Sequence, residues 1–356
     1  MYQLLRYGVA LSVALFALSA NADLQQELDN LAPGSSFQLP PETLSPLVIR
    51  VPGVSMSCAP ETVIDGGGQG NAVEILAEAI TFSDCQVRNW GKDLNELDAG
   101  IFVAREAQGS VVENNRLQGP AFGVWLDATP DVTVRENHIR GDTSLRSQDR
   151  GNGIHLFNTT GALIEGNDIS ETRDAIYIET ANRNTIRDNV MSDLRYGIHY
   201  MYSMHNLLEN NVTRGTRTGY ALMQSKYLKV FNNRSENDEN YGILMNFITN
   251  SELRNNVVTG VSQGQSAGVV ISGAEGKAVF IYNSLYNTFE GNYFGHSNIG
   301  IHLTAGSEEN QVFNNAFVEN QRQVKYVATR TQFWAEDGKG NYWSDYLGWD
   351  RNQDGL

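Results

Sequence analysis

The chain has 356 residues, of which 34 are glycine, 41% are hydrophobic and only two are cysteine. This composition excludes a disordered chain and a disulfide scaffold, because the apolar residues can fill a large core and the cysteines are too few to replace one. A formal charge of −15 excludes a protein that tracks along nucleic acid, since such a protein needs a basic face.

Residues 1–22 have the pattern of a secretory signal peptide. Arg6 is the only charge before an apolar run, and Ala20 and Ala22 occupy the small-residue positions of a signal-peptidase site. The apolar run is shorter than the ~20 residues that a membrane-spanning helix needs. We therefore expect a soluble exported protein, and the Asn-rich repeat without a eukaryotic retention signal favours a periplasmic location.

Residues 23–98 are expected to form an N-terminal cap and the first coils of a repeat. Leu24, Leu28 and Leu31 recur on one helical face, which predicts a short helix that covers the end of the repeat. Cys58 and Cys85 are 27 residues apart, about one coil plus a small insertion. In an oxidising compartment this spacing favours a structural disulfide over a metal pair.

A repeat occupies residues 99–322. Six stretches, four of them starting 22 residues apart, carry an Asn fourteen residues after their first small residue. Wider gaps between stretches contain insertions, such as 142–152 and 276–285. With three looser copies, the recurring Asn are Asn115, Asn137, Asn167, Asn189, Asn211, Asn233, Asn256, Asn292 and Asn315. We expect about nine stacked coils of about 22 residues that span roughly 40 Å.

Apolar residues alternate within each coil, as at Ile154 and Leu156 or at Ile176 and Ile178. This is the period of a strand with one buried face. Short strands with Asn and Gly at the corners predict an all-β fold, a right-handed parallel β-helix of the pectin-lyase-like kind. The recurring Asn should adopt the left-handed backbone conformation and bond to the Asn above and below it, as a structural ladder.

The residues between the buried positions should form two outward columns on one sheet. The first column is Phe102, Trp125, His155, Tyr177, His199, Ala221, Leu244, Val270 and His302. The second column is Ala104, Asp127, Phe157, Glu179, Met201, Met223, Asn246, Ser272 and Thr304. Such an aromatic exposed face indicates a binding surface, and the candidate partner-binding residues are Phe102, Trp125, His155, Phe157 and Tyr177.

Residues 199–205 contain two His and two Met. Met201 and Met223 fall at equivalent places on neighbouring coils, roughly 5 Å apart, with His199 about 7 Å along the strand. Imidazole and thioether groups suit Cu(I), so we expect these three residues to bind copper(I) transiently. The alternative is that they only cover a partner-facing sheet, because Met packs adaptably.

The sequence shows no catalytic constellation, and we expect no enzyme. Asp127 and Glu179 lie two coils apart in the second column, and no column of Lys or Arg accompanies them. Glu171, Arg173 and Asp174 fall in a predicted turn, where they could contact sugar but are expected to be solvated loop charges.

Residues 323–356 are expected to add a C-terminal coil and the start of a further segment. Asp350, Asn352 and Asp354 match the opening of a calcium loop. The chain ends before the carboxylate that such a loop needs at its twelfth position, so the calcium signal is incomplete.

Two motifs carry a specific resemblance. Residues 195–203, Arg-Tyr-Gly-Ile-His-Tyr-Met-Tyr-Ser, and residues 340–352, Gly-Asn-Tyr-Trp-Ser-Asp-Tyr-Leu-Gly-Trp-Asp-Arg-Asn, resemble the NosD family. Members are exported β-helix proteins that accompany an ABC-type ATPase and permease and help to mature the copper centre of nitrous-oxide reductase. The resemblance implies these partners, together with a copper chaperone or the reductase itself.

The family supplies no agreed catalytic residues. Its members usually continue past the position of Asp350, so the contact with the permease is expected to be incomplete in this chain. Two other functions stay open. A carbohydrate-binding or polysaccharide-modifying protein would explain the fold and the insertions, whereas a passive surface solenoid would explain the repeat alone.

Overall fold

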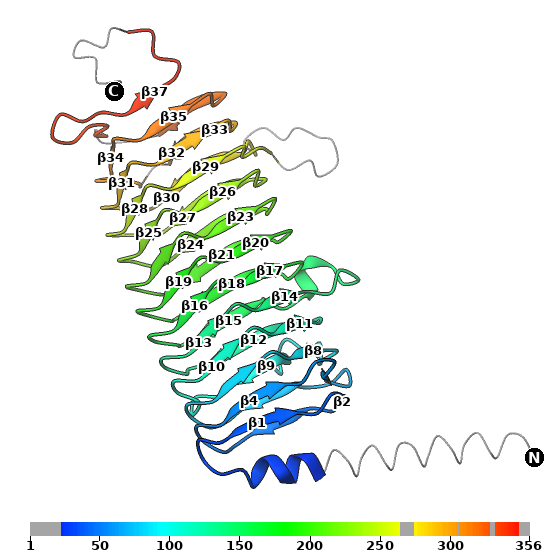
Figure 1. Cartoon of the computed structure of the whole chain (residues 1–356). Coiled ribbons are helices and arrows are strands. Elements are labelled where there is room, and N and C mark those ends of the chain that lie inside the picture. The colour runs from blue at the N-terminus through cyan, green and yellow to red at the C-terminus, as the bar shows by residue number, and fades with distance from the viewer. Residues whose placement is uncertain (1–22, 264–273, 305, 328–331, 349–356) are drawn as a thin grey trace, which may run out of the picture.

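The computed structural model describes residues 23–263, 274–304, 306–327 and 332–348 (Figure 1). The proposed signal peptide and the residues Asp350, Asn352 and Asp354 lie outside these ranges. The chain forms a parallel β-solenoid. Each strand pairs with a strand one coil earlier, usually the third strand before it in the chain, so that three long sheets run along one axis. Within the described residues no helix is long and apolar enough to cross a bilayer.

The three sheets, named A, B and C, contain 12, 13 and 12 strands. Sheet A consists of β1 (Ser36–Leu39), β4 (Ser55–Cys58), β7 (Thr81–Ser83), β10 (Val111–Glu113), β13 (Thr133–Arg135), β16 (Leu163–Glu165), β19 (Thr185–Arg187), β22 (Leu207–Glu209), β25 (Lys229–Phe231), β28 (Glu252–Arg254), β31 (Thr288–Glu290) and β34 (Gln311–Phe313). Sheet B consists of β2 (Thr43–Leu44), β5 (Val63–Asp65), β8 (Gln86–Arg88), β11 (Arg116–Gln118), β14 (His138–Arg140), β17 (Asp168–Ser170), β20 (Val190–Ser192), β23 (Val212–Arg214), β26 (Arg234–Glu236), β29 (Val257–Thr259), β32 (Tyr293–Gly295), β35 (Ala316–Val318) and β37 (Tyr342–Trp343). Sheet C consists of β3 (Leu47–Ile49), β6 (Val73–Ile75), β9 (Ala99–Val103), β12 (Phe122–Asp127), β15 (Ile154–Phe157), β18 (Asp174–Glu179), β21 (Tyr196–Met201), β24 (Thr218–Met223), β27 (Tyr241–Asn246), β30 (Lys277–Tyr282), β33 (Ile299–Leu303) and β36 (Arg322–Tyr326).

The alternation of apolar residues correctly predicts the inside of the solenoid. Ile154, Leu156, Ile176 and Ile178 are fully buried, and the register pairs the first two with the second two across β15 and β18. Apolar residues from all three sheets meet in one core that extends along the whole stack. A 3-10 turn, η1 (Ser147–Asp149), lies in the predicted insertion 142–152 and contributes no buried residue to this core.

The corner asparagines form a continuous buried ladder. Each side-chain amide donates to the side-chain oxygen of the next Asn, at 2.8–3.2 Å, from Asn115 to Asn315. The ladder gains one member that the sequence reasoning missed, since Asn315 donates to Asn341 at 3.0 Å. Asn341 belongs to the second family motif, so this part of the motif has a structural role.

One expectation about the ladder is wrong. The left-handed backbone conformation belongs to the residue before each ladder Asn from Asn115 to Asn315, such as Asn114 (φ 55°), Glu136 (φ 55°) and Asp188 (φ 58°). The turn made by that residue places the following Asn side chain inside the solenoid, where its amide must find partners.

The number of coils also differs from expectation. Sheets of 12 and 13 strands replace the nine coils predicted, and their length is about 55 Å at the usual strand spacing. The count was too low because the coils before Asn115 lack the ladder Asn and because Asn341, in the last coil, was not recognised as a member of the ladder. The predicted insertion 276–285 is also wrong, since Lys277–Tyr282 is strand β30. Val270 and Ser272 lie outside the described residues.

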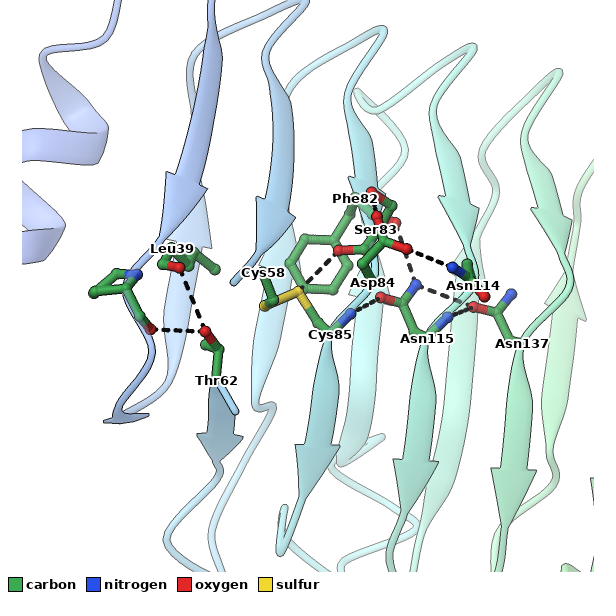
Figure 2. Close-up of a disulfide and its surroundings, with 11 residues drawn as sticks. Leu39, Cys58, Thr62, Phe82, Ser83, Asp84, Cys85, Asn114, Asn115 and Asn137 are labelled. Carbon is green, nitrogen blue, oxygen red and sulfur yellow. Dashed lines mark hydrogen bonds between the residues drawn. A yellow bond between two sulfur atoms is a disulfide. The ribbon is translucent and has the colours of Figure 1, made fainter. Parts of the chain in front are cut away.

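A disulfide and a helix close the N-terminal end. Cys58 and Cys85 are bonded, with 2.08 Å between their sulfur atoms, and Cys85 takes the ladder position below Asn115 (Figure 2). The helix over residues 23–29 buries Leu28 against the core, as predicted. Its Gln25 side chain donates to the backbone oxygen of Val48 and accepts from the backbone nitrogen of Val48, so the open edge of β3 is satisfied.

Candidate functional site

The outer face of sheet C carries a row of aromatic and imidazole rings in tilted and edge-to-face contact. The register aligns Phe102, Trp125, His155, Tyr177 and His199 on five consecutive strands, from β9 to β21. Ring centroids are 4.0 Å apart for Trp125 and His155, 4.7 Å for His155 and Tyr177, and 4.5 Å for Tyr177 and His199. The predicted first column therefore exists as a contact series, although Phe280 stands where Val270 was expected.

Two of the five candidate partner-binding residues are buried, which corrects the predicted binding surface. Trp125 and His155 each retain only 5% of their accessible surface. Leu94 and Leu97, from the segment before β9, pack against the cluster that contains Trp125. Phe157 is the most exposed of the five candidate partner-binding residues, at 38%. Around Trp125 the column therefore belongs to a second, smaller hydrophobic core.

A buried ionic cluster lies at the end of the column. Asp174, at the start of β18, is 1% exposed and accepts from Arg195 at 2.5 and 2.8 Å. Nδ1 of His199 lies 3.0 Å from the same carboxylate. The expectation that Asp174 is a solvated loop charge is therefore wrong. The 22-residue period could have revealed the cluster, because it places Asp174 opposite Tyr196 and beside Arg195.

The surroundings of the cluster shift the pKa values of three of its groups or neighbours. Burial alone would raise the pKa of Asp174, but hydrogen bonds from His199 and Arg195 outweigh burial and lower it. Burial lowers the pKa of His155, although Glu179 stands 3.4 Å from its Nε2 and acts in the opposite direction. Burial, with the charges of Glu179 and Asp174, raises the pKa of Tyr177 to about 12. Tyr177 is therefore a poor proton acceptor at neutral pH.

The predicted copper ligands lie at the edge of this cluster. His199 and Met201 point outward from β21, and Met223 lies one strand away on β24, where the register Tyr200–Leu222 makes it the neighbour of Met201. Because a carboxylate can only accept, Nδ1 of His199 donates to Asp174, and in the neutral imidazole Nε2 then carries a lone pair. That Nε2 is buried and has no hydrogen-bond partner among the residues that the structure describes. Among the described residues, no group of three His, Cys, Asp or Glu could hold a metal.

An exposed aromatic corner was missed by the sequence reasoning. It lies where sheet C turns toward sheet A in four consecutive coils, over residues 201–205, 223–227, 246–250 and 282–286. Its large side chains are 43–59% exposed: Tyr202, Tyr227, Phe247, Tyr282 and Tyr286. A groove of about 680 Å³, lined by Tyr202, Met204, Lys226 and Phe247, crosses it. We call this surface the aromatic corner.

Four of the aromatic residues in the corner adopt a backbone conformation that is sterically unfavourable for bulky side chains. Tyr202, Tyr227, Phe247 and Tyr286 have φ between 53° and 58°, in the left-handed region. Asn158 and Gly161 take that conformation in an earlier coil, at a lower steric cost. The four segments of the corner contain no Asp or Glu, despite the acidity of the chain. Aligning the four segments by the repeat period would have shown both the recurring aromatic residues and the lack of acidic residues.

Solved structures share the fold at low sequence identity. The chain is similar to the A-module of mannuronan C-5 epimerase AlgE6 from Azotobacter vinelandii, with a TM-score of 0.60, 14% identity and coverage of 88% of this chain and 95% of that one. It is also similar to the surface protein and adhesin PfbA of Streptococcus pneumoniae, with a TM-score of 0.63, 10% identity and coverage of 86% and 96%. These likenesses show the pectin-lyase-like solenoid and nothing about activity.

Relatives of higher identity carry one name. A probable ABC transporter binding protein NosD of Pseudomonas aeruginosa is 60% identical over 301 residues, which are 85% of this chain and 70% of that protein. A protein of the same name from Stutzerimonas stutzeri is 51% identical over 357 residues, 99% of this chain and 82% of that protein. The model of the family described as periplasmic copper-binding protein (NosD) matches residues 135–348. The chain therefore belongs to the NosD family.

Proposed function

We propose that this protein is a periplasmic accessory factor that works with an ABC transporter in assembling the copper centre of nitrous-oxide reductase. In this proposal it holds Cu(I) briefly at His199, Met201 and Met223 and docks a copper chaperone or the reductase at the adjacent aromatic corner. Membership of the NosD family supports the role, and the names of the relatives support the link to a transporter.

The buried Nε2 of His199 is the observation that carries the copper proposal. Asp174 fixes the tautomer by accepting from Nδ1, as carboxylates behind metal-binding histidines do. Arg195 holds Asp174 in place through two hydrogen bonds. The two thioethers on adjacent strands complete a soft ligand set that prefers Cu(I) to hard cations.

The aromatic corner supports the docking part of the proposal. Exposed aromatic residues are the side chains that dominate binding energy at protein interfaces. Two segments of the corner begin at Met201 and Met223, so a partner bound there would lie beside the candidate copper ligands. The protein would then act by bringing metal donor and acceptor together, which raises their effective concentration without a chemical step.

A Cu(I) titration of the purified protein against a chromophoric chelator tests the ligand set. In the variant Met201→Leu with Met223→Leu the fold should persist, because the volumes are similar and both positions are only half-buried. We expect at least a roughly tenfold loss of Cu(I) affinity, about 1.4 kcal/mol.

Met204→Leu is the matched control, because Met204 is equally half-buried in the same coil but lies beyond the strand. Its affinity should stay within about twofold of the parent protein. An unchanged affinity in the double variant would reject these ligands and leave the packing interpretation of the two methionines.

A deletion strain tests the cellular role. It should export nitrous-oxide reductase that lacks its copper centre, and Tyr202→Ala with Phe247→Ala should partly reproduce that defect. Tyr326→Ala, an exposed tyrosine outside the corner, should not. Fully metallated, active reductase in the deletion strain would overturn the proposed function.

A polysaccharide-modifying enzyme is the competing function, and the Asp174, Arg195 and His199 cluster is the feature that favours it. The buried carboxylate and the raised pKa of Tyr177 leave no exposed acid and base pair in this cluster. Release of unsaturated products from polyuronates by the purified protein, lost in His199→Gln, would establish the enzyme instead.

A further inference from the structure

A second surface, on the outer face of sheet B, is basic, although the chain as a whole is acidic. A groove of about 440 Å³ lies over β8, β11 and β14. The polar side chains that line it are Gln86, Arg88, Arg116, Gln118, His138 and Arg140. All six are exposed, and no Asp or Glu lines the groove. We call this surface the arginine face.

The strand register orders these side chains in two rows. One row is Gln86, Arg116 and His138, and the other is Arg88, Gln118 and Arg140. Neighbouring strands lie about 4.8 Å apart, and diagonal positions on adjacent strands lie about 7–8 Å apart. Arg116 and Arg140 hold such a diagonal pair of positions on β11 and β14.

These two arginines differ from most of the other strand arginines in the described part of the chain. Arginines on neighbouring coils usually pair with a carboxylate one strand away, as in Arg187 with Glu165 and Arg214 with Glu236. Arg116 instead lies between Gln86 and His138, and Arg140 lies between Gln118 and Ser170. Within the part of the chain that the structure describes, neither guanidinium forms an ion pair; at the margins Arg88 pairs with Asp65 and His138 with Asp168.

The chemistry of the face selects an acidic ligand. An unpaired guanidinium offers a planar fork of donors that matches a carboxylate. No Phe, Tyr or Trp lines the groove, so it lacks the aromatic platform on which the bases of single-stranded nucleic acids stack. The face is open and extended, which suits a chain better than a single small ion.

We propose that the arginine face docks an extended acidic segment of a partner protein, with carboxylates at alternate residues. Alternate side chains of an extended strand lie on one side, about 6.8 Å apart, close to the diagonal spacing of Arg116 and Arg140. The charge of −15 repels such a segment from the remaining surface, so the face also fixes its orientation. This site is separate from the aromatic corner and does not depend on copper.

Fluorescence anisotropy with the full chain and a labelled ten-residue peptide that alternates Glu and Thr tests the proposal. The peptide should bind, and its counterpart with Gln in place of Glu should bind at least tenfold more weakly. Arg116→Gln with Arg140→Gln should cause a loss of similar size and leave the fold intact, because both side chains are exposed and unpaired.

Arg214→Gln is the matched control, since Arg214 lies on the same sheet but is neutralised by Glu236. It should change peptide affinity less than twofold. Equal binding of the Glu and Gln peptides, or no binding of either, would overturn the proposal. Tighter binding of oligogalacturonate than of the Glu peptide, lost in the double variant, would also overturn it and assign the face to an acidic polysaccharide.

Discussion

Two buried aspartates of this solenoid differ in the groups that donate hydrogen bonds to their carboxylates. Asp174 lies on the outer side of sheet C, under the aromatic column, and accepts from a guanidinium and an imidazole. Asp238 lies inside the solenoid just before β27 and accepts only from neutral groups. Its donors are the hydroxyls of Thr213, Thr216 and Ser235 and the backbone nitrogen of Thr216, at 2.6–2.8 Å.

The pKa values of the two carboxyls move in opposite directions. Burial acts on both and would raise both. At Asp174 the hydrogen bonds from His199 and Arg195 outweigh burial and lower the pKa, whereas at Asp238 four hydrogen bonds from neutral donors do not, and the pKa is raised. Saturating a buried carboxylate with hydrogen bonds therefore does not replace a counter-charge.

Removing the counter-charge at Asp174 should have the largest effect on stability. Arg195→Met keeps much of the side-chain volume but leaves Asp174 buried without a cation. We expect a loss of about 3 kcal/mol in the free energy of unfolding, measured by urea denaturation. Arg214→Met, which breaks an exposed pair, should cost less than about 1 kcal/mol. Equal costs for the two variants would refute the proposed role of the counter-charge.

The same substitution at both aspartates separates the two environments directly. Asp174→Asn turns an amide NH₂ toward the donors Arg195 and His199 and should cost about 2 kcal/mol. Asp238→Asn keeps an acceptor for Thr216, and its NH₂ can donate to the hydroxyls of Thr213 and Ser235, so we expect a cost below about 1 kcal/mol. Thermal and urea denaturation of the two variants would decide, and the reverse order would contradict the comparison.

The raised pKa of Asp238 predicts an unusual pH dependence. A carboxyl whose pKa is higher in the folded than in the unfolded state contributes stability that is complete below the unfolded value, near 3.8, and is lost as the pH rises through the folded value. Asp238→Asn removes this contribution. The thermal midpoint of the variant should therefore fall further below that of the parent protein as the pH is lowered from 7 to 4. A constant difference across this range would show that Asp238 does not titrate there.

Two buried tyrosines provide the smallest test of the same idea. The Tyr220 hydroxyl lies 2.8 Å from the backbone oxygen of Asn211, while the buried Tyr200 hydroxyl has no hydrogen-bond partner in the described part of the chain. Tyr220→Phe should cost about 1 kcal/mol, whereas Tyr200→Phe should be neutral or slightly stabilising. Urea denaturation at neutral pH measures both, and a larger cost at Tyr200 would show that its hydroxyl is satisfied.

The sequence by itself determined the architecture, because the information is local and repeated. Alternating apolar residues fixed which side of each strand is buried, as at Ile154 and Leu156. The regular Asn marked a corner whose amides bond along the stack. A pattern repeated in coil after coil can be read even when single coils are irregular, although the coils without the Asn were not counted.

The sequence predicted less of the candidate site. It placed His199, Met201 and Met223 on neighbouring strands, and the strand register agrees with these positions. Metal binding by the three residues stays a prediction. The repeat period also contains the information needed to find the aromatic corner and the partners of Asp174. Alignment of coils is enough to find such neighbours.

Only the tertiary structure decided which outward side chains stay accessible. Trp125 and His155 point away from the solenoid core, yet Leu94, Leu97 and the neighbouring rings cover the cluster that they form. The pairing of Asp174 with both Arg195 and His199 likewise depends on side-chain directions across two coils. Periodicity separates the inside of a coil from its outside, but the cover on the outside comes from non-repeating segments and from contacts between coils, which no local pattern encodes.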